Sequence, residues 1–210
     1  MTTTARTRNP RGSGTRLREE IIDASIGLID ETNDASTLTL RGIARRADIT
    51  APSIYSHFAD LPAVIEAVLA ESFAQLKATV EEAIAIETDP ARALEAAGAA
   101  YVQFGWDHRA RYRLMFAATG YSDDAVQIFT LVEDAIARCV AAGESDSSDP
   151  RIDAYLLWVA MHGIATLEKP GRADYLRLGP LDRPAMLQTI ITRLARLTDP
   201  RLTNQESARN

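Results

Sequence analysis

Cysteine is nearly absent from the sequence, since Cys139 is the only one in 210 residues. A single cysteine excludes an internal disulfide framework and is typical of a reducing cytoplasm. Its side chain is either a small buried hydrophobic group or a redox sensor. No apolar stretch approaches the roughly 20 residues that a membrane-spanning helix needs, and the arginine-rich start lacks the apolar segment of a signal peptide. We therefore expect a cytoplasmic protein with no membrane partner.

The common patterns of catalytic and metal sites are also missing. The sequence has no Gly-x-Ser-x-Gly, no phosphate-binding loop and no Cys/His cluster with metal-ligand spacing. Ser56 and His57 are neighbours, and neighbours on a helix do not face one another. Asp123 and Asp124 fit the start of a helix better than a catalytic carboxylate pair. We therefore expect no enzymatic activity, no metal and no cofactor.

Strand-type alternation of apolar and polar residues is not found, whereas helical spacing recurs along the chain. The sequence predicts an all-α fold of about nine helices. A three-helix domain over residues 15–60 precedes a helical domain over residues 61–200, and a basic arm (1–14) and a tail (201–210) flank them. A long apolar stripe predicts one helix from about residue 61 to about 86, which joins the two domains.

The net charge of −6 is unevenly distributed along the chain. Residues 1–58 carry eight arginines against seven acidic residues, and the first 18 residues contain five arginines and no acid. Local charge decides whether phosphate is attracted, so the acidic total does not exclude nucleic acid. The arm either frays, or neutralises phosphates and reaches a minor groove.

Two short helical patterns separated by a tight turn occupy residues 39–58. Thr39 is a good N-cap for the first helix, and Asp48 tolerates the left-handed backbone that a sharp turn requires. Thr50 is the expected cap of the second helix, which we expect to run to Phe58. Two such helices form a helix-turn-helix, whose second helix fits the major groove of DNA.

The same stretch resembles the DNA-binding domain of the TetR family of transcriptional regulators. The resemblance covers roughly residues 15–70 and rests on Leu38–Ala44 and Ile49–Phe58, with Tyr-x-His-Phe closing the second helix. The chain departs from the family at Leu61 and Pro62, where a lysine commonly lies beside the phosphate backbone. In the second domain, Tyr101–Phe116 and the pattern Trp158-x-x-x-His162-Gly163 are similar to one C-terminal domain type of this family.

Arg41 is the predicted base contact, because arginine is the best single reader of guanine. The alternative is a solvated side chain that touches only phosphate. The residues that the motif and the resemblance place against DNA are Thr39, Arg41, Thr50, Ala51, Pro52, Ser53, Tyr55 and His57. One such unit reads too few base pairs for discrimination, so we expect a homodimer on a near-palindromic operator in double-stranded DNA.

Large soft side chains are frequent in the second domain, where they either fill the core or line a small-molecule cavity. The resemblance implies an effector site, and the candidate residues are Phe104, Met115, Phe116, Phe129, Trp158 and His162. His162 is either a polar contact for an apolar or aromatic effector or a satisfied core histidine. The identity of the effector does not follow from these residues.

The segment from Arg151 to Glu168 is apolar nearly all round, so it must be covered on every side. It is either monomer core or part of a four-helix subunit interface, as in similar regulators. The candidate interface residues are Leu156, Gly163, Leu187, Ile190 and Leu194.

These observations predict a ligand-responsive, homodimeric repressor that an effector releases from its operator. A helical small-molecule-binding or scaffolding protein with a degenerate helix-turn-helix is the alternative from a different class. It is favoured by Leu61 and by a recognition surface without Arg, Lys, Asn or Gln.

Overall fold

The computed structural model describes residues 13–117, 123–166 and 183–198. Within these ranges the chain forms nine α-helices, one short 3-10 helix and an isolated bridge between Ser145 and Leu197, which confirms the all-α prediction. None of the helices in these ranges is both long and apolar enough to span a membrane. The predicted tail and all but the end of the predicted arm lie outside the described residues.

The chain divides into two compact units, residues 1–72 and 73–210. The division falls inside α4 (Leu61–Ile86), a continuous helix of 26 residues whose bounds agree with those expected from its apolar stripe. The carboxylate of Asp60 accepts a hydrogen bond from the Ala63 amide at 2.9 Å, which satisfies an amide of the first turn. Each unit therefore contains part of the same helix.

Unit 1 consists of α1 (Ser13–Thr32), the 3-10 helix η1 (Ala35–Thr37), α2 (Leu40–Arg46), α3 (Ala51–Ile54) and the start of α4. α2 packs against both α1 and α3. Aliphatic side chains at helical spacing form the core, which includes Ile21, Ile29, Ile43, Ile54, Val64 and Val68. This core holds the two short helices of the predicted motif in place, since neither is long enough to be stable alone.

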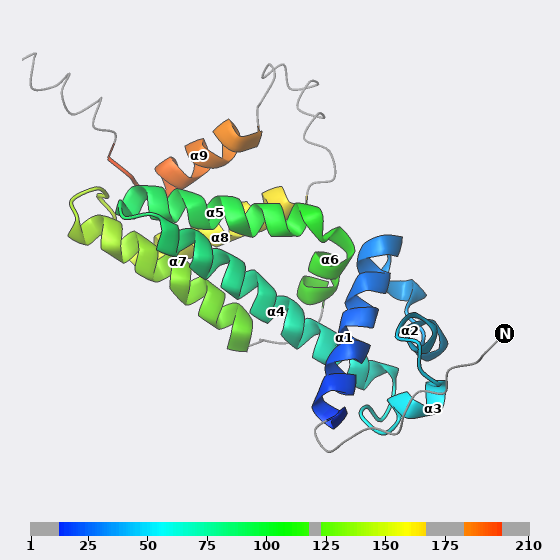
Figure 1. The fold of residues 1–210 in the computed structure, drawn as a ribbon. Coiled ribbons are helices and arrows are strands. Elements are labelled where there is room, and N and C mark those ends of the chain that lie inside the picture. Colours follow the sequence, from blue (N-terminus) through cyan, green and yellow to red (C-terminus); the bar gives the residue numbers. More distant parts are fainter. Residues whose placement is uncertain (1–12, 118–122, 167–182, 199–210) are drawn as a thin grey trace, which may run out of the picture. The chain divides into compact units, whose positions relative to one another are not determined.

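Unit 2 contains the rest of α4 and the helices α5 (Pro90–Asp107), α6 (Arg109–Ala117), α7 (Asp123–Ala141), α8 (Pro150–Thr166) and α9 (Arg183–Leu194). α5 is its central helix and packs against α7, α8 and α9 (Figure 1).

Small residues on α5 allow this close packing. A Cβ added at Gly98 would lie 2.6 Å from Cδ1 of Ile191 on α9, and one at Gly105 would lie 2.8 Å from Cβ of Ala165 on α8.

α5 has a side-chain cap at its N-terminus. The Asp89 carboxylate accepts a hydrogen bond from the Arg92 amide at 2.8 Å, and Pro90 occupies the first turn, where a missing amide costs little.

Candidate functional site

The turn between α2 and α3 closes with two backbone hydrogen bonds. The Ile49 amide donates to the Ala44 carbonyl at 2.9 Å, and the Asp48 amide donates to the Arg45 carbonyl at 3.4 Å. Asp48 has a φ of 52°, so it takes the left-handed conformation expected of it. This hydrogen-bond pattern is a Schellman motif, which ends α2 and sets the direction of α3.

The caps of the two helices differ. The Thr39 hydroxyl accepts from the Gly42 amide at 3.1 Å, which confirms the predicted cap of α2. Thr50 has the extended backbone of an N-cap, but its hydroxyl pairs with the Ser53 hydroxyl at 2.8 Å and caps no amide. The sequence-based expectation for the Thr50 side chain was therefore wrong, because a nearby hydroxyl offers a competing partner.

The second helix is also shorter than expected. α3 ends at Ile54, and the amides of His57 and Phe58 both donate to the Ile54 carbonyl at 2.9 Å. The Ser56 hydroxyl donates to the Ser53 carbonyl at 2.7 Å. This side-chain bond competes with the backbone amide that would bond the same carbonyl if the helix continued. Ile54 and Phe58 are nevertheless buried, as their spacing predicts.

The predicted DNA-contacting residues all lie on α2, α3 and the segments beside them. Those exposed are Thr39, Arg41, Thr50, Pro52 and Tyr55, and those half-buried are Ala51, Ser53 and His57. Tyr55 is large and leaves 60% of its surface exposed.

Arg46 is engaged inside unit 1. Its Nη1 lies 2.5 Å from Oε2 of Glu31 on α1, and this hydrogen bond lowers the pKa of Glu31. Arg41 is exposed in the first turn of α2. The nearest atom to a Cβ added at Gly27 is Nη2 of Arg46, at 2.5 Å, so the small residue at position 27 lets this side chain cross α1. No periodicity in the sequence predicts this pair, because its partners are 15 residues apart.

Three of the predicted effector residues form an aromatic cluster in unit 2. Ring centroids of Phe116 and His162 lie 4.7 Å apart, and those of Trp158 and His162 lie 5.8 Å apart in a stacked arrangement. Tyr112 joins the cluster, with its centroid 4.7 Å from that of Phe116. Phe104 and Met115 are buried, with 6% and 3% of their surface exposed, and Phe104 packs against the Arg111 guanidinium at 5.3 Å.

A polar chain crosses this cluster. The Tyr112 hydroxyl donates to the Tyr101 hydroxyl at 2.9 Å and lies 2.8 Å from Nδ1 of His162. Burial raises the pKa of Tyr101 to about 12, although the hydrogen bonds with Tyr112 and Trp158 oppose this rise. Burial also raises the pKa of Tyr112 and lowers the pKa of His162. All three side chains are therefore held neutral. Tyr101 and Tyr112 were not among the predicted site residues, because only tertiary contacts identify them: Tyr112 meets His162, and Tyr101 meets Tyr112.

A groove of about 360 Å³ runs between α7 and α8. Two predicted effector residues, Phe129 and Trp158, line this groove, which we call the α7–α8 groove. Its other lining residues are Ala125, Val126, Arg151, Ile152 and Tyr155. The spacing of Arg151, Tyr155, Trp158 and His162 by three or four residues places them on one side of α8, a signal that the sequence contained.

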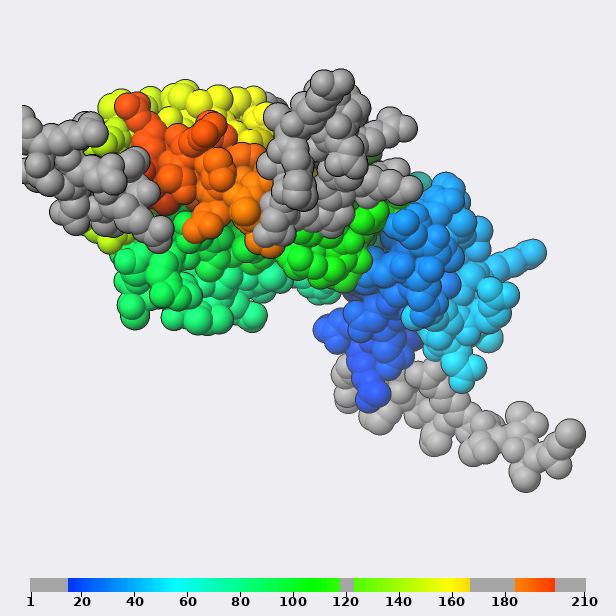
Figure 2. Space-filling model, turned by 90° about the horizontal axis from the view of Figure 1, so that it is seen from above, coloured from blue at the N-terminus to red at the C-terminus, as the bar shows by residue number. Residues whose placement is uncertain are grey.

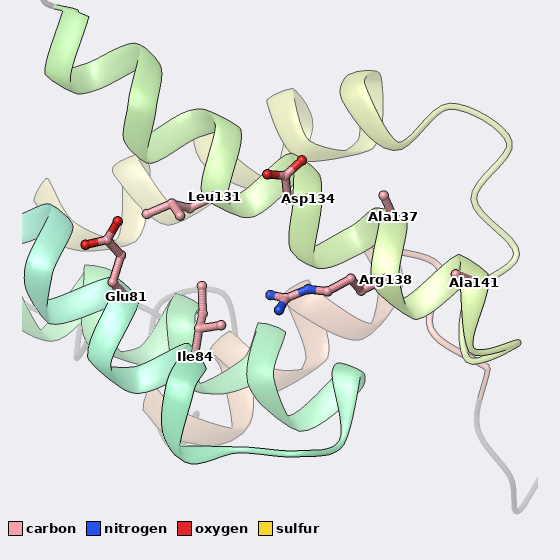
Figure 3. Close-up of a pocket in the computed structure, with 7 residues that line it drawn as sticks. All are labelled: Glu81, Ile84, Leu131, Asp134, Ala137, Arg138 and Ala141. Atoms are coloured by element: carbon pink, nitrogen blue, oxygen red, sulfur yellow. The ribbon is translucent and has the colours of Figure 1, made fainter.

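A larger groove, of about 520 Å³, lies between α4 and α7. Figure 3 shows Glu81 and Ile84 on α4 across from Leu131, Asp134 and Arg138 on α7. Two carboxylates and one guanidinium make the lining of this groove more polar than that of the α7–α8 groove, although apolar side chains contribute most of it. None of the predicted effector residues lines it, and an apolar ligand fits the aromatic α7–α8 groove better.

The predicted interface residues differ in exposure. On α8, Leu156 is 47% exposed, and a Cβ added at Gly163 would meet no atom within 4 Å. On α9, Ile190 and Leu194 are half-buried. Leu187 is only 6% exposed, so its side chain packs inside its own chain and offers little surface to a second subunit.

Known proteins provide an independent comparison. Residues 94–194 match the family model described as "Tetracyclin repressor-like, C-terminal domain". No curated protein matches the chain.

Solved structures share the fold over most of their length. A protein of unknown function from Rhodococcus sp. RHA1 is 25% identical, with a TM-score of 0.67 over 90% of this chain and 95% of the other. SmeT, the repressor of the Stenotrophomonas maltophilia multidrug efflux pump SmeDEF, is 22% identical, with a TM-score of 0.59 over 87% and 91%. A TetR family transcription regulator from Marinobacter aquaeolei VT8 is 10% identical, with a TM-score of 0.62 over 90% and 100%.

Proposed function

Since this chain belongs to the TetR family of transcriptional regulators, we propose that it is a repressor that binds a near-palindromic operator as a homodimer. A small apolar or aromatic effector releases it from DNA. We expect it to act in the cytoplasm and to have no enzymatic activity. The observation that carries the proposal is the helix-turn-helix of unit 1, closed by the Asp48 turn, with Arg41 and Tyr55 exposed on it.

Arg41 is the proposed reader of bases. It occupies the first turn of α2, its side chain is exposed, and a guanidinium can donate to both O6 and N7 of guanine. Tyr55 and His57 suit phosphate contacts, which position the protein on the duplex. Asp60 precedes α4, which begins with Leu61 and Pro62, so this segment has no lysine and phosphate attraction has to come from arginines elsewhere.

The proposed dimer interface lies on α8 and α9, which Figure 2 shows side by side on the surface of unit 2. Exposed residues on α8 recur at helical spacing and form one face, made by Leu156, Val159 and Gly163. Ile152 and Tyr155 are also exposed, but they line the α7–α8 groove and are not part of this face. An exposed apolar face of this kind favours association, because it would otherwise remain in water. Ile190 and Leu194 extend the face onto α9, and Leu187 supports α9 from within.

α4 is the proposed lever between ligand and DNA. It contributes residues to both units without a break. An effector in unit 2 shifts the equilibrium only if it binds the DNA-competent and DNA-incompetent states with different affinity.

Selection of bound fragments from a random DNA pool tests the proposal. A near-palindrome should be enriched, and affinity for it should fall linearly with salt on logarithmic axes. Replacing Arg41 with Ala should weaken binding to this operator by roughly ten- to a hundred-fold while affecting random DNA less. The matched control is Arg45→Ala, an exposed arginine on the same helix, which should not change the preferred bases. Failure to select any sequence would refute the proposal, and equal losses for Arg41→Ala on operator and random DNA would refute the assigned role of Arg41.

A further inference from the structure

The walls of the α7–α8 groove are aromatic and aliphatic. Phe129 comes from α7, and Tyr155 and Trp158 come from α8. The ring centroids of Tyr155 and Trp158 lie 6.2 Å apart. Val126 and Ile152 are 49% and 54% exposed, so the groove opens to solvent at its edges. Its volume of about 360 Å³ is within the range of sites for small molecules.

Among the residues that the structure describes, the one charged residue that lines the groove is Arg151. The Arg151 guanidinium carbon lies 5.8 Å from the centroid of the Phe129 ring, and Nη1 lies 3.3 Å from Oε2 of Glu133. Phe129 and Glu133 are one turn apart on α7, so Arg151 reaches from α8 over a ring and a carboxylate in succession. A guanidinium has five N–H donors, and the Glu133 contact uses Nη1.

The Arg151–Glu133 pair is at the surface, since 73% of the Arg151 side chain is exposed. Exposed ion pairs of this kind contribute little to stability. Another carboxylate can therefore replace Glu133 at small cost, provided that the rest of its molecule is bound by the groove. The Glu133 carboxylate therefore shows where a ligand's carboxylate could contact Arg151.

We propose that the α7–α8 groove binds an aromatic monocarboxylate. The ligand's ring packs between Phe129, Tyr155 and Trp158, where offset and edge contacts between rings are favourable. Its carboxylate pairs with Arg151, and arginine is suited to bidentate recognition of this group. Glu133 then turns to solvent. The α4–α7 groove is a poorer site for such a ligand, because Glu81 and Asp134 repel an anion.

This inference rests on the proposed function, since it assigns a chemical class to the effector. It also makes a prediction that a purely apolar effector site does not make: the Glu133 carboxylate competes with the ligand's carboxylate for Arg151.

Titration calorimetry with 2-naphthoate and its neutral amide, at physiological salt, tests the inference. The dimeric full-length protein should bind the acid more tightly than the amide. Arg151→Gln should weaken acid binding by roughly five- to ten-fold, the scale of a charge-assisted hydrogen bond, and leave the amide unchanged. Glu133→Gln should strengthen acid binding by roughly two- to five-fold, because it removes the competing carboxylate.

Arg138→Gln is the matched control, since it removes an exposed arginine of α7 that lines the other groove. It should leave the affinity for both probes unchanged. Both groove substitutions are at a surface pair, so the variants should fold, and a circular dichroism melt of each one checks this.

Equal affinities for acid and amide, no gain in Glu133→Gln, or no binding of either probe would each overturn the inference. DNA selection on the same protein separates this result from the proposed function. An enriched palindrome without naphthoate binding removes only the ligand assignment. If naphthoate binds with the expected variant effects but the protein prefers no DNA sequence, the ligand site is supported and the proposed repressor function is refuted.

Discussion

The hydrogen-bonded chain of buried Tyr101, buried Tyr112 and half-buried His162 offers a quantitative test of unit 2. Tyr112→Phe keeps the ring and its contact with Phe116, but removes the hydroxyl that lies 2.9 Å from the Tyr101 hydroxyl and 2.8 Å from Nδ1 of His162. Each lost hydrogen bond costs about 1 kcal/mol, and a buried group left without a partner costs about 1–3 kcal/mol. Tyr101 and His162 each lose a hydrogen-bond partner, and Tyr101 is fully buried, so we expect a total loss of about 2–3 kcal/mol.

Urea unfolding followed by circular dichroism measures this loss. All proteins must be compared at one concentration, because the proposed dimerisation would shift the apparent stability by mass action. The matched control is Tyr55→Phe, which removes a hydroxyl from a residue that is 60% exposed and should change stability by less than about 0.5 kcal/mol. If Tyr112→Phe destabilises the protein no more than Tyr55→Phe, the hydroxyl of Tyr112 does not link buried Tyr101 to His162 and the reasoning fails.

Three further predictions concern the turn, the histidine and the interface. Asp48→Gly should stabilise the protein by about 0.5–1 kcal/mol and Asp48→Val should destabilise it by about 1–2 kcal/mol, because only glycine takes a φ of 52° without cost; calorimetry giving the reverse order would contradict the left-handed turn. Burial lowers the pKa of His162, so the unfolded chain takes up this proton at higher pH than the folded one. Stability should therefore decline as pH falls from the unfolded pKa of 6.5 toward the lower folded pKa. Urea midpoints across this range should decline less steeply for His162→Gln, and identical pH profiles would exclude His162 as the cause. Leu156→Glu should give monomers in sedimentation velocity, whereas Ile86→Glu, at a residue 79% exposed on α4, should remain dimeric; a Leu156→Glu dimer would place the interface elsewhere.

Local features of the helix-turn-helix could be predicted from the sequence because their causes lie within a few residues. Thr39 caps α2 through an amide three residues away, and Asp48 is one of the few residue types that tolerate the turn. The long helix α4 was equally predictable, because its apolar stripe continues without a break from one unit to the other. The end of α3 was not, since the side chains of Ser53 and Ser56 compete for groups of the backbone and of Thr50.

The candidate effector residues show the limit of composition. The six candidates have different environments in the fold. Phe104 and Met115 are buried, Phe116 and Trp158 pack around His162, and Phe129 lines a groove together with Trp158. The choice between core and cavity depends on neighbours from other helices, which helical periodicity does not specify.

Short-range spacing and caps were sufficient to predict the helical class and the position of the helix-turn-helix, and a motif within that stretch carried the resemblance to the family. Which side chains meet across helices follows from the packing of the fold. This packing paired Tyr112 with His162, placed Arg151 over Phe129 beside Glu133, and turned Leu187 inward while leaving Leu156 exposed. These contacts join residues distant in the chain, and their energies depend on burial and geometry that no local pattern contains.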